Sequence, residues 1–66
     1  MYEELNKLID GLERASAFLY PGEINPMYEA VSDYCQRRFD KLTGDEQASI
    51  ERRLSDADDL IKARNV

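Results

Sequence analysis

The chain has 66 residues, and a domain of this size buries only about 60% of the surface that its unfolded chain exposes, so it holds one small core. Its 42% hydrophobic residues favour a folded chain despite 35% charged residues, and a net charge of −5 lacks the basic excess with which nucleic-acid and membrane-surface binders attract phosphate. A single cysteine, with no histidine, excludes an intrachain disulfide and a structural zinc site.

The first predicted helix covers residues 2–19. Pro21 disfavours helical dihedral angles at Tyr20, and Pro21-Gly22 is typical of the centre of a type II turn, so we expect the helix to end near Leu19. Gly11 is its one weak position. The apolar residues recur every three or four positions, as they do on one helical face: Tyr2, Leu5, Leu8, Ile9, Leu12, Ala15 and Leu19.

The second predicted helix covers residues 26–43. Asn25 is a favourable N-cap, and Pro26 suits the first helical position, where its missing N–H costs nothing. Gly44 is expected to end the helix. Its predicted inward face consists of Tyr28, Val31, Cys35, Phe39 and Leu42, widened by Met27, Ala30 and Tyr34.

The third predicted helix covers residues 45–63 and begins with Thr43 and Glu46 at the spacing of a capping box. Its apolar stripe is the thinnest of the three. Two alternatives therefore stay open: the helix packs on its own chain, or it is exchanged with a second copy. The stripe consists of Ile50, Leu54, Ala57, Leu60 and Ile61. The sequence therefore predicts one all-α domain, an antiparallel helical hairpin plus a third helix, that self-associates.

Residue types argue against an enzyme. There is no histidine for acid–base work, and most of the fourteen acids occupy solvent positions of the helix pattern. The run "SDADDL" lacks the glycine and terminal glutamate of a calcium loop. Cys35 lies on an apolar stripe, which favours a buried thiol over a nucleophile activated by Arg38. We predict no catalytic residue, no cofactor and no metal.

The sequence favours a small cytoplasmic protein-interaction module or accessory regulator, of a size and charge common among phage and mobile-element proteins. The unpaired cysteine fits a reducing compartment, and no apolar run is long enough for a membrane span or leader. Its large side chains exceed what three short helices enclose, so we expect docking to a protein partner and a homodimer. The candidate partner-binding residues are Tyr20, Ile24, Tyr28, Tyr34, Arg37, Arg38, Arg52 and Arg53. For the bend at Ile24, capping of the core is the alternative.

A nucleic-acid-associated regulator is the second hypothesis. The turn "KLTGDEQ" between two helices is similar to a helix-turn-helix, and the arginines at 37, 38, 52 and 53, with Lys41, would form a basic patch if they gathered. Asp45 and Glu46 would face phosphate, however, and helix-end complementarity also accounts for the arginines, which argues against direct nucleic-acid binding. A third hypothesis, DNA mimicry, has the least support because the negative charge is evenly spread.

The segments "IDGLER" and "RFDKLT" resemble the central two helices of the Hha/YmoA family, small helical bacterial proteins that bind and modulate the histone-like nucleoid-structuring protein. The resemblance covers roughly the middle half of the chain and implies a nucleoid-associated partner, with Arg38 worth testing. The chain departs from the family in lacking an extra N-terminal helix, in its "YPG" turn and in Gln36 where an acid is expected. The matching residues are Ile9, Asp10, Leu12, Glu13, Arg14, Arg38, Leu42 and Thr43.

Overall fold

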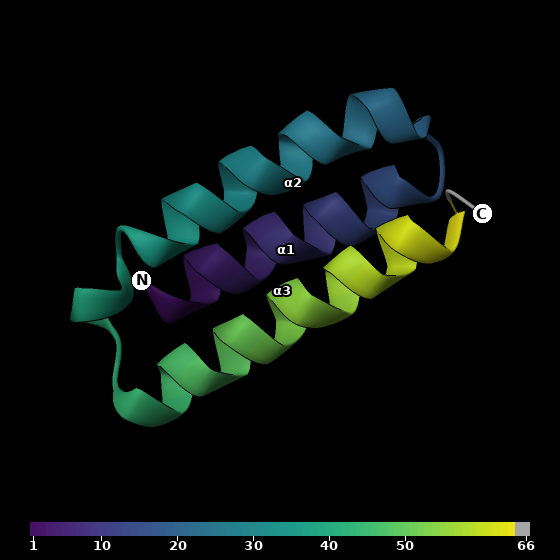
Figure 1. The fold of residues 1–66 in the computed structure, drawn as a ribbon. Helices are drawn as coiled ribbons and strands as arrows, with labels where there is room; N and C mark the ends of the chain where they lie inside the picture. The colour runs from purple at the N-terminus through teal and green to yellow at the C-terminus, as the bar shows by residue number, and fades with distance from the viewer. Residues whose placement is uncertain (65–66) are drawn as a thin grey trace.

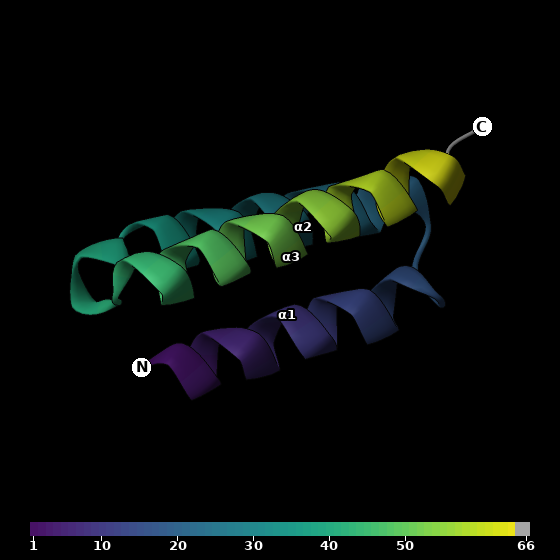
Figure 2. The same ribbon diagram turned by 90° about the horizontal axis from the view of Figure 1, so that it is seen from below.

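A computed structural model describes residues 1–64 as a bundle of three α-helices, which confirms the predicted all-α, three-helix fold (Figure 1). The helices are α1 (Tyr2–Ser16), α2 (Pro21–Gln36) and α3 (Gly44–Arg64), with a short 3-10 helix, η1 (Phe39–Lys41), between the last two. Each α-helix contacts the other two, so α3 packs on its own chain. The chain reverses direction at each connection, and Figure 2 shows the same three rods from below.

The core consists of two groups of buried side chains joined in the middle. One group comprises Leu5, Ile9, Cys35, Leu42, Ile50 and Leu54, and lies toward the end that holds the N-terminus. The other comprises Leu12, Ile24, Ala57 and Ile61, and lies toward the connection between α1 and α2. Tyr28 and Val31 are partly buried and pack against both groups.

Helix α2 begins at Pro21, so the prediction that it begins at Pro26 is wrong. Tyr20 is extended (φ −74°, ψ 158°) and its carbonyl accepts hydrogen bonds from the N–H groups of Glu23 and Ile24. Gly22 has no positive φ, so the predicted type II turn is absent. Pro21 therefore has the first helical position that the sequence assigned to Pro26, and the early start carries Ile24 into the core.

The other helix limits also differ from the predictions. Helix α1 ends at Ser16 rather than residue 19, although N–H groups of Phe18 and Leu19 still bond the carbonyl of Ala15. Helix α2 ends at Gln36 rather than residue 43. The chain then turns through η1 to an extended Leu42, whose side chain is buried. A helix that continued to residue 43 would carry the chain past α3 instead of back toward it.

Gly44 does not end α2; it is the first residue of α3. The capping box that starts α3 is confirmed. The N–H of Glu46 donates to Thr43 Oγ1 (3.2 Å), and the N–H of Thr43 donates to Glu46 Oε1 (3.0 Å). Gln47 Nε2 also donates to the carbonyls of Phe39 and Leu42, which ties η1 to the first turns of α3.

Candidate protein interface

An exposed apolar surface follows the groove between α1 and α2. Leu8, Met27 and Tyr34 keep 39%, 39% and 37% of their surface exposed, although all three were expected on inward faces. Leu8 lines an open groove of about 310 Å³ with Ala30, Val31 and Tyr34. We call this surface the α1/α2 seam and define it by the residues on its two outer stripes, which are Leu8, Gly11 and Ala15 of α1 and Met27, Ala30 and Tyr34 of α2.

The two stripes of the seam have the same spacing, three residues and then four. Residues 8, 11 and 15 follow this spacing on α1, and residues 27, 30 and 34 follow it on α2. This is the spacing with which a helix presents side chains to a partner helix in a coiled coil. The inward stripes of the same helices already fill the core. Each of the two helices therefore has a second apolar stripe beside its core face, exposed at residues 8 and 11 of α1 and at residues 27, 30 and 34 of α2, while Ala15 is partly buried against the core.

Acidic and basic side chains lie at both ends of the seam. Glu4 and Glu23 precede Leu8 and Met27 by four residues, which places each acid one turn before its stripe. Arg14 is three residues beyond Gly11, and Arg38 lies at the other end of α2. Because α1 and α2 run in opposite directions, Glu4 and Arg38 share one end, and Arg14 and Glu23 share the other (Figure 1).

Arg38 is held against the seam. Its guanidinium carbon lies 3.4 Å from the centroid of the Tyr34 ring, and its Nη1 donates to the Tyr34 carbonyl at 3.1 Å. A cation over an aromatic face contributes roughly 0.5–1 kcal/mol at an exposed site. The Arg38 guanidinium is therefore stacked on the Tyr34 ring at the end of the groove.

The other predicted partner-binding aromatic and apolar residues are divided between surface and core. Tyr20 is 77% exposed in the connection between α1 and α2, next to Phe18 at 84%. Ile24 is only 3% exposed, so its assignment to a partner surface is wrong and the alternative, that it caps the core, is confirmed. Tyr28 is partly buried, and this burial raises the pKa of its hydroxyl. It is not part of the seam.

Two of the four arginines of the predicted patch, Arg37 and Arg53, form ion pairs with carboxylates of the same chain. Arg37 pairs with Asp33 through its Nε at 2.9 Å, one turn back on the same helix. Arg52 is exposed near Asp45. Arg53 turns away from both toward α1, where it is engaged by the side chains of Asn6, Asp10 and Glu13. Its direction follows from the carboxylates on the flank of α1 that faces α3.

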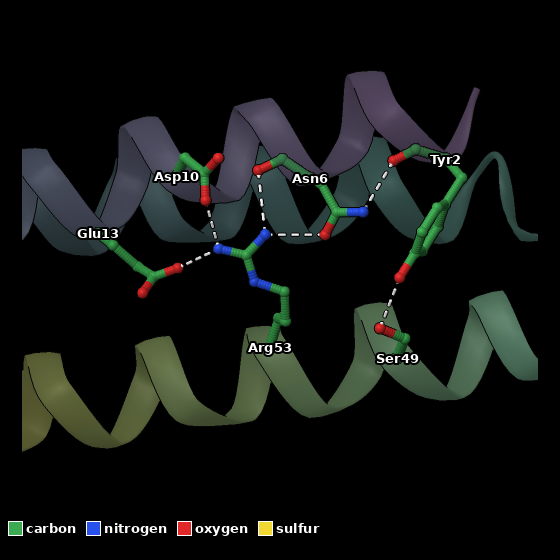
Figure 3. A network of polar contacts seen from close by, with 6 residues as sticks. All are labelled: Tyr2, Asn6, Asp10, Glu13, Ser49 and Arg53. Carbon is green, nitrogen blue, oxygen red and sulfur yellow. Dashed lines mark hydrogen bonds and ion pairs between the residues drawn. The ribbon is translucent and has the colours of Figure 1, made fainter.

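Arg53 is the centre of a polar network between α1 and α3 (Figure 3). Its Nη1 donates to the carbonyl and to Oδ1 of Asn6, at 3.2 and 2.8 Å. Its Nη2 donates to Asp10 Oδ1 at 2.5 Å and to Glu13 Oε1. Hydrogen bonding to Asp10, reinforced by Glu13, raises the pKa of Arg53, so the guanidinium stays charged and provides no proton-transfer chemistry. The network sets the register of α1 on α3.

A second contact extends the same connection toward the N-terminus. The hydroxyls of Tyr2 and Ser49 lie 2.8 Å apart, and this hydrogen bond lowers the pKa of Tyr2. Asn6 Nδ2 donates to the Tyr2 carbonyl at 3.2 Å (Figure 3). This connection was not predicted from the sequence. Its signal was the polar stripe of Asn6, Asp10 and Glu13, which repeats every three or four residues beside the apolar face.

The cysteine and the potential metal ligands are the remaining groups that the sequence singled out. Cys35 is fully buried, and burial raises the pKa of its thiol while Arg38 offsets part of this effect. Within residues 1–64 no three potential ligands from His, Cys, Asp and Glu lie close enough to hold a metal ion. Over the same range no helix combines the length and apolar character needed to cross a bilayer.

A polar groove of about 540 Å³ lies between α2 and α3. Its walls carry hydroxyl, amide and carboxylate groups from Ser32, Gln36, Glu51, Ser55 and Asp58, beside Tyr28, Phe39 and Leu54. In residues 1–64, no buried side-chain nitrogen or oxygen lacks a hydrogen-bond partner. No buried polar group therefore points to a ligand in this groove.

Comparison of the chain with models of known protein families, with curated protein sequences and with solved structures finds no match. The resemblance to the Hha/YmoA proteins therefore stays a prediction. The α1/α2 seam is the candidate site on which a functional proposal has to rest.

Proposed function

We propose that this chain is a small cytoplasmic protein-interaction module that acts by docking through the α1/α2 seam rather than by catalysis. The observation that carries this proposal is the exposure of Leu8, Met27 and Tyr34 along two stripes with coiled-coil spacing. A single exposed leucine on a small protein needs no explanation, but an ordered apolar groove beside a half-exposed tyrosine is typical of interaction surfaces.

Docking would complete the burial of side chains that the monomer covers only in part. Leu8, Met27 and Tyr34 each have about two fifths of their surface left to bury, which is worth roughly 1 kcal/mol apiece. Tyr34 with Arg38 forms the natural anchor, because tyrosine and arginine are enriched among residues that dominate binding energy. The charged ends of the seam would form the rim of the interface and orient the partner.

The second hypothesis, a nucleic-acid-associated regulator, is less well supported by these contacts. The pairing of Arg37 with Asp33, and of Arg53 with Asp10 and Glu13, removes two of the cations on which phosphate binding would depend. We therefore propose that any regulatory role is exerted through a protein partner. The resemblance to a family that binds a nucleoid protein points the same way.

The proposal can be tested with two matched substitutions. Ala30→Glu adds a charge in the middle of the seam, and Ala48→Glu adds the same charge on an exposed position of α3. Each immobilised protein is used to capture binding proteins from a cytoplasmic extract, after circular dichroism has shown equal thermal stability. We expect the native chain and Ala48→Glu to retain the same proteins and Ala30→Glu to lose them. Equal capture by all three would contradict docking through the seam.

A further inference from the structure

We propose that the occupant of the α1/α2 seam is a second copy of this chain, related by a two-fold axis that brings the two α1–α2 hairpins face to face with facing helices antiparallel. This inference rests on the proposed function, because it names the partner for the same surface. Three observations support it: the charges at the seam ends, an exposed glycine in the middle of α1, and the size of the face.

The charges of the seam are complementary to themselves. One end carries Glu4 and Arg38, and the other carries Arg14 and Glu23. If α1 faces α2 of the other copy, Glu4 meets Arg38 and Arg14 meets Glu23. If instead α1 faces α1, the ends exchange, so Glu4 meets Arg14 and Arg38 meets Glu23. Both two-fold arrangements with antiparallel facing helices therefore place each acid opposite a base.

This balance is local to the seam. The whole chain carries −5, whereas Glu4, Glu23, Arg14 and Arg38 add up to zero, and Lys7, beside Leu8 on α1, adds one further positive charge. Over residues 1–64, the ion pairs present involve neither Glu4 nor Glu23 nor Arg14. These groups are available to a second copy at no cost to an existing pair.

Within residues 1–64 nothing requires a glycine at position 11, whereas close approach of a second copy would. It lies in the interior of α1 without a positive φ, and a Cβ added there would meet no atom within 4 Å. Neither the backbone nor the packing of one chain requires a glycine, which weakens a helix relative to alanine. Gly11 and Ala30 occupy the middle positions of the two stripes of the seam. Small residues at these positions let facing helices approach to the short end of the usual 8–10 Å range.

The face has the size of a modest interface. With 15 and 16 residues, α1 and α2 are about 23 Å long, and two helices side by side are about 20 Å wide. A face of this length and width gives an interface area at the low end of specific protein interfaces. We therefore expect a dimer with a dissociation constant in the micromolar range.

The test uses sedimentation equilibrium of the full chain from 1 to 500 µM, with native protein, Gly11→Ala, Ala30→Glu and Ala48→Glu. We expect native protein and Ala48→Glu to approach twice the 7.6 kDa monomer mass, and Ala30→Glu to stay monomeric. Gly11→Ala is the decisive variant, since it should weaken dimerisation at least about tenfold while raising the Tm of the dilute monomer by about 4 °C. Weakened association of a better-folded variant cannot come from misfolding.

Charge substitution gives an independent result. Glu4→Lys should raise the dissociation constant of the dimer several-fold. A second substitution in the same chain should return it to the native value: Arg38→Glu if α1 faces α2 of the other copy, and Arg14→Glu if α1 faces α1. A native chain that stays at 7.6 kDa at 500 µM, a Gly11→Ala chain that dimerises as well as native, or no restoration by either arginine substitution would overturn the inference. A monomeric native chain that still loses its captured proteins in Ala30→Glu would refute the dimer and leave the docking function intact.

Discussion

Arg52 and Arg53 are neighbours in the chain with opposite surroundings. Arg52 is exposed to solvent, whereas the side chain of Arg53 is only 27% exposed and donates to Asn6, Asp10 and Glu13. One step along a helix rotates the side chain by about 100°, which is enough to move it from solvent to the α1–α3 contact. Identical residue types therefore have different roles here, and composition alone could not separate them.

We predict that Arg53→Met lowers the free energy of unfolding by about 1–2 kcal/mol, while Arg52→Met changes it by less than about 0.5 kcal/mol. Methionine keeps the apolar stem but removes every hydrogen bond of the network. The expected loss is moderate because Asp10 and Glu13 are 53% and 39% exposed, so water screens them and replaces the lost donor. Urea unfolding followed by circular dichroism measures both values, and equal effects would contradict a structural role for Arg53.

Only some of the individual residues of the candidate site were predicted from the sequence. Tyr20 and Arg38 are exposed or partly exposed as expected of partner-binding residues. Tyr34, which was assigned both to the inward face and to the partner surface, is partly exposed, and so are Leu8 and Met27, which were assigned to the core. Periodicity shows that a helix has a broad apolar face without showing how much of its width the other helices cover. In this bundle the covered width is narrow, so the edges of the predicted faces lie in solvent and form the seam.

At the scale of elements, the sequence correctly predicts that there are three helices and that a capping box starts the third. It misplaces the start of α2 because Pro21 and Pro26 satisfy the same local rule for a first helical position. The choice between them is tertiary. A helix that begins at Pro21 brings Ile24 into the core group of Leu12, Ala57 and Ile61, where its burial offsets much of the cost of Pro26 inside the helix.

We predict that Pro26→Ala stabilises the protein by about 1–2 kcal/mol. Proline inside a helix costs roughly 3 kcal/mol relative to alanine, so its replacement stabilises the helix by about that amount. Alanine also gives the unfolded chain more conformational freedom, which offsets up to about 1 kcal/mol of the stabilisation. Pro21→Ala is the matched control and should be neutral or slightly destabilising, because Pro21 is at the first helical position. The thermal midpoint of each dilute variant measures the effect. Stabilisation by Pro21→Ala and not by Pro26→Ala would contradict the observed start of α2.

For the whole molecule, the two halves of the core form one folding unit. Tyr28 and Val31 of α2 pack against both halves, so neither half can lose its packing without exposing part of the other. A chain of 66 residues has little stability to divide between independent units. Cys35 lies in one half and is fully buried, which makes its thiol a reporter on the state of the other half.

We predict that Ile61→Val, in the half of the core that lacks Cys35, speeds the reaction of the Cys35 thiol with a thiol reagent by about 2- to 10-fold. The substitution removes one buried methylene, worth roughly 0.5–1.5 kcal/mol, and the thiol reacts only from opened molecules. Labelling is measured at low protein concentration and neutral pH. An unchanged rate, with a lowered thermal midpoint, would show that the two halves open separately.

The polar connections of the bundle are unevenly distributed. Within residues 1–64, the side-chain hydrogen bonds and ion pairs that join one α-helix to another all join α1 to α3, through Arg53 and through Tyr2 with Ser49. Helix α2 is held by apolar contacts, which have no preferred direction and tolerate small sliding movements. The register of α1 against α3 is therefore set by directional hydrogen bonds, whereas the position of α2, the other wall of the seam, is set by the shapes of the apolar side chains packed against it.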